Sequence, residues 1–458
     1  MIASVRVAAR IRRTTSGVTG ALWLAASLAC AGPEPRPRSV LLIVVDTLRA
    51  DHLGLYGYTR PTSPALDARA VRGVVFERAF ASSSWTLPSF GSLYTGRNPA
   101  AHGAGTRLDP GPKPNFAPLP ADLPVLAETL RSAGFATAAL VENPFLHPAF
   151  GVARGFGTYR YLFRGFKVPP RADRMVEAAL RWLSARDQRP FLLLLHLMAP
   201  HAPYDPPPDV RGRFTAGYTG VLRLPFAGFG PRIPQSVIES PADRDFIEGA
   251  YDEELLGVDR ALAPLFDALE RKAFGERLLV IFTSDHGEEL FDHGSLEHGH
   301  TLHEELLRIP LVVWAPGVRP ARVDAPVSHV DLLPTILDAL GVSPPAGLAG
   351  VSLWPLLGGG APPPERVLVS EKMLYGPERR AWLRWPWKAI VTEGAAPVLY
   401  QLDRDPGEAV DVAAEHAAEL AALRAVGEAA AAAQSVAPHA AAIDAATRAQ
   451  LESLGYGD

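Results

Sequence analysis

The sequence LLVIFTSDHGEE, at residues 278–289, is an apolar run followed directly by acidic residues and a histidine. An apolar run of this length, rich in β-branched and aromatic residues, predicts a buried strand. Such a strand would deliver Asp285 and His286 to one edge of a sheet. A carboxylate oxygen beside an imidazole nitrogen suits zinc, manganese or a similar divalent ion.

A second apolar run, SVLLIVVD at residues 39–46, also ends in an aspartate, Asp46. Other strand-like runs, such as VVFERAF, ATAALV, FLLLLHLM and PLVVWAP, alternate with helical patterns such as RMVEAALRWLSA and YDEELLGVDRALAPLFDALE. This alternation predicts an α/β fold with a mostly parallel central sheet sandwiched by helices. Because ligands gather at the carboxyl ends of the strands in such sheets, we expect Asp46 and Asp285 to share one site.

The chain divides by composition into three parts. Residues 1–38 hold arginines, the short apolar run GVTGALWLAASLAC and a Pro-rich segment, and they predict an export signal or lipoprotein signal with a linker. Residues 39–357 carry the alternating pattern. Residues 365–458 predict a small C-terminal α+β subdomain of short antiparallel strands with an Ala-rich helical tail. We therefore expect an exported protein, either periplasmic or lipid-anchored at the cell envelope through Cys30, and both forms stay open.

Composition limits the partners and the metal ligands. The chain of 458 residues has a net charge of −4 and no basic cluster beyond its N-terminus, so nucleic acid is not an expected partner. A single cysteine excludes an internal disulfide framework and a Cys-based zinc site. Any metal must therefore be bound by His, Asp, Glu or hydroxyl side chains.

Several ordered motifs resemble the sulfatase family of the alkaline phosphatase superfamily. They are VVDTLRADHLGLYGYTRPTSPALD, SSSWTLPSFGSLYTGRNPAAHG, HLMAPHAPYDPP, SDHGEELFDHGSLEHGHTLHEELLRIPLVVWAPG, VSHVDLLPTILDALG and LYQLDRDPGE. The resemblance implies that residues 39–357 form a catalytic domain in which one divalent metal holds a nucleophile against a sulfate or phosphate group. The positions that match the metal ligands are Asp46, Thr86, Asp285 and His286. Sulfatases commonly have a second aspartate where this chain has Thr47, so zinc or manganese is favoured and calcium stays an alternative.

The motif WTLPSFGSLYTGR departs from the pattern of the family. Sulfatases have a cysteine or serine two residues before the proline, which they oxidise to formylglycine, and an arginine two residues after it. This chain has Thr86 and Phe90 at those positions. Threonine cannot give an aldehyde, so we expect no formylglycine and predict that the Thr86 hydroxyl acts directly as a metal-activated nucleophile. The alternative is that Thr86 only caps the following helix.

Histidines complete the predicted site. The resemblance implies catalytic roles for His201, His298 and His300, and substrate-binding roles for His196 and Arg97. Structural roles are predicted for residues outside the site. His293 and His303 are expected to bond the backbone, and His329 and Asp331 are expected to brace a helix. Arg49 has two predicted roles, and pairing with Asp51 is one of them.

The predicted function is a metal-dependent hydrolase that uses a threonine nucleophile on phosphate or phosphonate esters. The substrate would be a small-molecule, glycan or lipid ester. The alternatives are a sulfuric ester hydrolase that acts without formylglycine, a phosphoryl-group transferase, and a non-catalytic binder.

Overall fold

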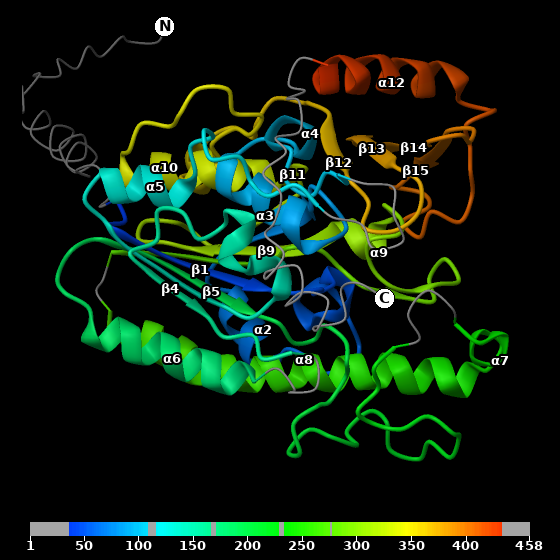
Figure 1. Ribbon diagram of the computed structural model, residues 1–458, viewed down its shortest axis with the longest axis horizontal. Coiled ribbons are helices and arrows are strands. Elements are labelled where there is room, and N and C mark those ends of the chain that lie inside the picture. The colour runs from blue at the N-terminus through cyan, green and yellow to red at the C-terminus, as the bar shows by residue number, and fades with distance from the viewer. Residues whose placement is uncertain (1–35, 109–115, 166–170, 229–232, 275–276, 433–458) are drawn as a thin grey trace, which may run out of the picture. The chain divides into compact units, whose positions relative to one another are not determined.

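The computed structural model describes residues 36–108, 116–165, 171–228, 233–274 and 277–432 (Figure 1). The predicted export signal with Cys30, and the end of the Ala-rich tail, lie outside the described residues. Within the described ranges no helix is long and apolar enough to cross a membrane.

A central sheet organises the described part of the chain, and it contains nine strands there. Its order is β10-β2-β9-β6-β1-β5-β3-β4, with β11 paired to β2. Most neighbours run parallel, but β9 pairs antiparallel with both β2 and β6. The strands are β1 (Ser39–Val45), β2 (Val74–Phe80), β3 (Ala136–Val141), β4 (Thr158–Tyr161), β5 (Phe191–Leu197), β6 (Leu278–Ser284), β9 (Arg308–Trp314), β10 (Ala321–Val323) and β11 (Val327–Ser328).

Helices cover both faces of the sheet, which is why its central strands are apolar throughout. In β1, Val40, Leu42 and Val44 pack into one hydrophobic core, whereas Leu41 and Ile43 pack into a second core on the other face. The first face carries α3 (Thr86–Thr95), α5 (Leu126–Ser132) and α10 (Leu332–Leu340) (Figure 1). The second carries α2 (Pro64–Ala70), α6 (Ala172–Ala185) and α8 (Pro241–Glu270). The predicted α/β fold is therefore confirmed.

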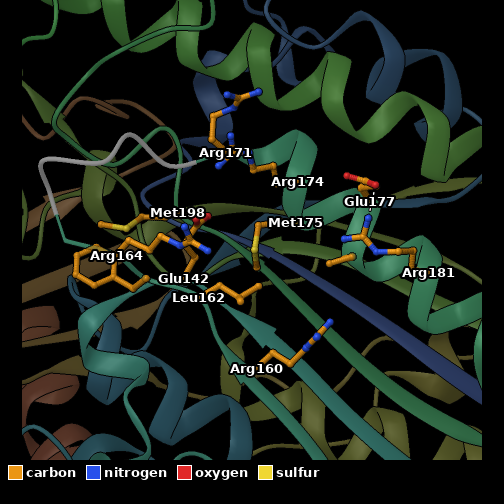
Figure 2. A pocket seen from close by; sticks show the side chains of 12 residues that line it. Glu142, Arg160, Leu162, Arg164, Arg171, Arg174, Met175, Glu177, Arg181 and Met198 are labelled. Atoms are coloured by element: carbon orange, nitrogen blue, oxygen red, sulfur yellow. Dashed lines mark hydrogen bonds and ion pairs between the residues drawn. The ribbon is translucent and has the colours of Figure 1, made fainter.

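The longest helix, α8, begins at a cap and supports the insertion that precedes it. Ser240 accepts a hydrogen bond from the backbone N–H of Asp243, and Pro241 occupies the first helical position. In the described residues 203–228 and 233–240, this insertion includes α7 (Gln235–Ile238) and contacts α8, where Glu253 accepts the backbone N–H groups of Phe214 and Thr215. At the start of α6 a cavity of about 360 Å³ opens beside β3 and β4 (Figure 2).

A smaller antiparallel sheet follows near the C-terminus, as predicted. It has the order β12 (Leu368–Glu371), β13 (Arg379–Arg384), β14 (Trp387–Thr392) and β15 (Val398–Gln401), and α12 (Ala417–Ala432) packs on it. The Glu371 N–H donates to the Ser82 carbonyl at 3.0 Å, so this sheet contacts the segment that leads into α3. The predicted domain limits at 357 and 365 stay a prediction. Short elements complete the chain: α4 (Pro99–His102), α9 (Glu304–Leu307), α11 (Trp354–Leu357), β7 (Glu289–Leu290), β8 (Leu296–Glu297), and the 3₁₀ turns Ala50–His52, Gly54–Tyr56, Pro144–Leu146, Pro148–Phe150 and His329–Asp331.

Candidate metal centre and active site

Three adjacent parallel strands bring polar side chains to one edge of the central sheet. Asp46 follows β1, Asp285 and His286 follow β6, and His196 lies near the end of β5. One ligand atom from each of Asp46, Asp285 and His286 lies within 4.8 Å of the others. All three side chains are fully buried. The strand ends therefore form the shared site that the sequence predicted.

The position of the proton on the His286 ring favours a cation between these ligands. Its Nδ1 lies 2.9 Å from the Gly287 carbonyl, which can only accept, so Nδ1 carries the proton. The lone pair on Nε2 then faces Asp46 Oδ1 at 3.6 Å and Asp285 Oδ2 at 3.5 Å. These two carboxylate oxygens are buried without a hydrogen-bond partner. Three unprotonated acceptors that face one another are repulsive unless a cation lies between them.

The pKa values of the two carboxyl groups, Asp46 and Asp285, are shifted in opposite directions. Burial alone would raise the pKa of Asp46, but the neighbouring imidazole of His196, with His201 and His286, holds that pKa well below its usual range. Burial and the neighbouring Asp46 charge raise the pKa of Asp285 well above its usual range. Burial, with the charge of His298, lowers the pKa of His286 to about 3. The site thus disfavours a second negative charge unless a cation compensates, and it keeps His286 neutral, as a metal ligand must be.

Thr86 is the first residue of α3, and its side chain points to this centre. The N-cap is Trp85, which makes no side-chain capping bond, so the alternative in which Thr86 only caps the helix is wrong. Its Oγ1 lies 3.5 Å from His286 Nε2 and accepts a hydrogen bond from Asn143 Nδ2 at 3.2 Å. The free N–H groups of the first turn of α3 favour an anion at the same place.

Asn143 is a site residue that the sequence analysis missed. It follows β3 and donates from Nδ2 to Asp46 Oδ2 at 2.6 Å as well as to Thr86 Oγ1. Its Oδ1 accepts the Phe145 N–H at 2.8 Å, which fixes the orientation of the amide. A single asparagine has no motif of its own. Its place at the carboxyl end of a strand beside β5 was the signal that could have found it.

The predicted histidines separate into two groups. His196 is buried with Nε2 3.3 Å from Asp46 Oδ2, although the pair lacks hydrogen-bond geometry. The ring of His298 lies 4.5 Å from that of His286 and 4.9 Å from that of His201, so both belong to the cluster. His298 Nδ1 also bonds Glu288 at 2.8 Å. His300 instead bonds Glu289 at 2.7 Å, and among the residues that the structure describes no hydrogen bond or ion pair joins it to Asp46, Asp285 or His286.

Arg97 does not lie at the centre. It follows α3 at the end opposite Thr86, and its guanidinium donates to the Ala346 carbonyl at 2.8 Å. A helix of this length separates its two ends by about 15 Å. The placement therefore gives its predicted substrate-binding role no support. Phe90, which replaces the arginine of the family motif, is buried and meets the ring of His196 edge-on at 5.5 Å.

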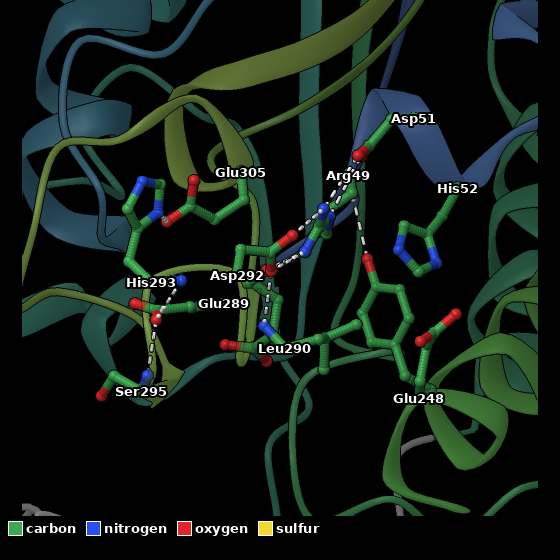
Figure 3. A network of polar contacts seen from close by, with 12 residues as sticks. Arg49, Asp51, His52, Glu248, Glu289, Leu290, Asp292, His293, Ser295 and Glu305 are labelled. Carbon is green, nitrogen blue, oxygen red and sulfur yellow. Dashed lines mark hydrogen bonds and ion pairs between the residues drawn. The ribbon is translucent and has the colours of Figure 1, made fainter. Parts of the chain in front are cut away.

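Arg49 pairs with Asp51, which was one of the two roles predicted for it (Figure 3). Its guanidinium bonds Asp51 at 2.8 Å and Asp292 at 2.6 Å, and it also donates to the Glu288 carbonyl. Its backbone N–H donates to the Tyr251 hydroxyl at 3.0 Å. Arg49 thereby ties the loop after β1 to α8 and to the β7–β8 hairpin, which carries Glu288 and is followed by His298.

Three further histidines, His329, His293 and His303, make structural contacts. His329 braces as expected: its Nε2 donates to the Ser284 carbonyl at 2.9 Å, while Asp331 completes a capping box with Ser328. The backbone bonding predicted for His293 and His303 is incomplete, because both bind carboxylates. His293 Nδ1 lies 2.9 Å from Glu305, and His303 Nδ1 lies 3.1 Å from Glu408.

The donor set fits a divalent metal. Asp46, Asp285 and His286 would hold it, and Thr86 Oγ1 is placed to join them. Two carboxylates, one imidazole and one hydroxyl form a mixed oxygen and nitrogen set.

Comparison with known proteins agrees with this architecture. The family model described as Sulfatase matches residues 38–342. The Delta 4,5-hexuronate-2-O-sulfatase of Bacteroides thetaiotaomicron is 24% identical over 86% of this chain and 88% of its own length. Human Arylsulfatase A is 28% identical over 84% of this chain and 85% of its own. The crystal structure of the phosphonate monoester hydrolase of Agrobacterium radiobacter superposes with a TM-score of 0.70 at 24% identity, over 85% of this chain and 96% of that one. The chain belongs to the sulfatase family, and it is a hydrolase of the alkaline phosphatase superfamily.

Proposed function

We propose that this protein hydrolyses phosphate or phosphonate esters with Thr86 as its nucleophile. The observation that carries the proposal is the position of Thr86 Oγ1, which lies 3.5 Å from the lone-pair nitrogen of His286 in the buried ligand cluster. A divalent ion bound there, with zinc or manganese favoured, would act as a Lewis acid and lower the pKa of the threonine hydroxyl.

The chain's own residues support the remaining steps. Thr86 gives its hydroxyl proton to solvent, and its Oγ1 forms the bond to phosphorus while the bond to the leaving oxygen breaks. Asn143, which donates to Thr86 Oγ1, holds that oxygen in place and stabilises negative charge on it. His201 and His298 lie beside the cluster, and because burial lowers the pKa of His298 well below its usual value, His201 is the better placed of the two to give a proton to the leaving oxygen. Water then cleaves the phosphothreonine ester and frees Thr86.

Threonine chemistry favours phosphorus over sulfur. A sulfated formylglycine hydrate can eliminate sulfate and return to the aldehyde, whereas a sulfated threonine lacks the second hydroxyl that drives this step. A phosphothreonine can be cleaved by attack of water at phosphorus. The fold does not decide between the two, because its solved neighbours include sulfatases and phosphonate monoester hydrolases.

A second candidate is a sulfuric ester hydrolase that acts without formylglycine. The curated relatives favour it, since several of them are named as sulfatases. The same cluster would then activate Thr86 toward sulfur.

The test compares the wild type with Thr86→Ser and Thr86→Ala on an aryl phosphodiester, an aryl phosphonate monoester and an aryl sulfate, with metal analysis of each protein. We expect about one bound metal ion, preferred turnover of the phosphorus esters, activity retained in the serine variant, and kcat lowered about 10³-fold or more in the alanine variant. Faster turnover of the sulfate would establish the second candidate. No metal and no turnover of any probe would indicate a non-catalytic binder.

A further inference from the structure

A cavity of about 360 Å³ lies beside the active-site edge of the sheet (Figure 2). Its walls come from the end of β3, from β4 and the residues after it, from the residue after β5, and from the first turns of α6. This volume falls in the range that holds a sugar-sized group rather than a single ion.

Arginine dominates the walls of the cavity. The five arginines are Arg160, Arg164, Arg171, Arg174 and Arg181. Arg171 pairs with Asp173 at 2.5 Å, and Arg181 pairs with Glu177 one turn away. The structure gives Arg160, Arg164 and Arg174 no ion pair with any residue that it describes. All five side chains are exposed, and the guanidinium groups of Arg160, Arg164 and Arg174 remain available to a ligand.

Glu142 is the acidic residue at the base of the cavity. One of its carboxylate oxygens, Oε2, is buried without a hydrogen-bond partner. Burial raises the pKa of Glu142 to about 7, although the nearby Arg171 N–H and Arg174 favour its charged form. A carboxyl group that is partly protonated near neutral pH opposes an anionic ligand less than a full charge does, and it can donate a hydrogen bond.

Apolar side chains form the remaining surface of the cavity. Leu162, Met175 and Met198 line it, and the two methionines are each only 1% exposed. Figure 2 shows these side chains among the arginines. An apolar floor under a cationic rim suits a carbon framework that bears several anionic substituents better than it suits a free inorganic ion.

The cavity adjoins the catalytic residues along the chain. Glu142 directly precedes Asn143, which bonds Asp46 and Thr86. Met198 follows β5 two residues after His196. We infer that this arginine-lined cavity binds an anionic substituent of the substrate apart from the reacting ester, so that the preferred substrate is a polyanion such as a multiply sulfated or phosphorylated saccharide. The inference rests on the proposed function for the reacting group, but the binding itself can be tested separately.

The experiment measures binding by calorimetry in the Thr86→Ala background, where no turnover interferes. The probes are a dextran sulfate oligosaccharide and the uncharged dextran oligosaccharide of the same length. The cavity variant adds Arg160→Gln and Arg174→Gln. The matched control adds Arg131→Gln and Arg319→Gln, which remove the same charge from exposed arginines on other elements. Circular dichroism checks that all variants fold.

We expect the sulfated probe to bind the background and the control alike, the cavity variant to bind it about tenfold or more weakly, and the uncharged probe not to bind. Equal weakening in the cavity and control variants, equal affinity in all three proteins, or equal binding of both probes would overturn the inference. Wild type that hydrolyses none of the small esters would refute the proposed function, while the arginine-dependent binding would still decide the role of the cavity.

Discussion

Thr47 shows strain at the residue scale. Its backbone has a φ of 52°, a left-handed value that a β-branched residue rarely adopts. The Tyr251 hydroxyl donates to its carbonyl at 2.8 Å, and its N–H points to Asp285 Oδ1 at 3.4 Å. The Thr47 hydroxyl is buried without a partner. Strain of this kind persists only where the surrounding structure holds the residue, and here Tyr251 and the candidate metal ligand Asp285 hold it.

We predict that Thr47→Asp shifts the metal preference of the site toward calcium. The change adds a third carboxylate where the family commonly has its second aspartate, and aspartate tolerates the left-handed backbone better than threonine. The affinity for calcium relative to zinc should rise about tenfold or more, as measured by competition with a chromogenic chelator. Thr47→Asn is the control of similar shape without charge. Equal preferences in the Asp and Asn variants would contradict the prediction.

Asn143 leads to a second prediction at this scale. Asn143→Ala removes the donor shared by Asp46 Oδ2 and Thr86 Oγ1, and kcat should fall about a hundredfold. Asn143→Asp adds a carboxylate next to Asp46 and should lose at least as much activity. Steady-state kinetics on the best aryl ester checks both. A change in KM with unchanged kcat would mean that Asn143 serves only ground-state binding.

At the scale of elements, the guanidinium of Arg49 anchors the β7–β8 hairpin to the loop after β1. Arg49 is 4% exposed and joins Asp51, Asp292 and the Glu288 carbonyl. Burial opposes its charge, but the two aspartates raise its pKa further above its ordinary value, so it stays charged throughout the working range.

We predict that Arg49→Met lowers the free energy of unfolding by roughly 1–3 kcal/mol, because buried charge-assisted hydrogen bonds are lost while the partly exposed aspartates can regain water. Urea unfolding followed by fluorescence measures the change. Arg49→Lys, which keeps the charge without the planar fork, should lose less. A lysine variant as unstable as the methionine variant would show that hydrogen-bond geometry alone carries the effect.

Most elements could be predicted because their apolar patterns are unambiguous. The runs VVFERAF and ATAALV became β2 and β3 within the expected residues. The edge strand β4, Thr158–Tyr161, was missed because its sequence TYRY is short and polar. Periodicity also could not reveal the reversed direction of β9, since a buried antiparallel strand is as apolar as a parallel one.

The predicted site residues come together where motifs end strands, and the prediction was incomplete elsewhere. Asp46, Asp285 and His286 follow strands that the sequence identifies, so their meeting follows from topology. Which of His298 and His300 lies beside His286 depends on how the hairpin turns. The contacts of Asn143 with Asp46 and Thr86 depend on the direction of its side chain. The spacing of residues in the sequence predicts neither property.

On the scale of the whole molecule, a cluster of His293, His303, Lys388 and Glu408 joins the β7–β8 hairpin and the start of α9 to the C-terminal sheet. The rings of His293 and His303 stack at 3.7 Å, and Lys388 binds Glu408 at 2.9 Å. The hydrogen bond to Glu305 raises the pKa of His293 to about 9, although burial opposes this.

This shift predicts lower stability in alkaline solution. The pKa of His293 is raised from 6.5 on folding, so its contribution is fully present below about pH 6.5 and is lost as the pH rises through about 9. Differential scanning calorimetry should show a fall in Tm between pH 6.5 and 9.5 that is smaller in His293→Gln. An identical fall in the variant would assign the alkaline loss to other groups.

Thr86 comes from a helix, whereas the other candidate ligands come from strand ends. This difference has an evolutionary consequence. The proposed nucleophile is one side chain at the start of α3, whereas Asp46, Asp285 and His286 follow β1 and β6. On the proposed function, a single codon change at residue 86 therefore exchanges one reaction chemistry for another while the predicted metal ligands stay in place.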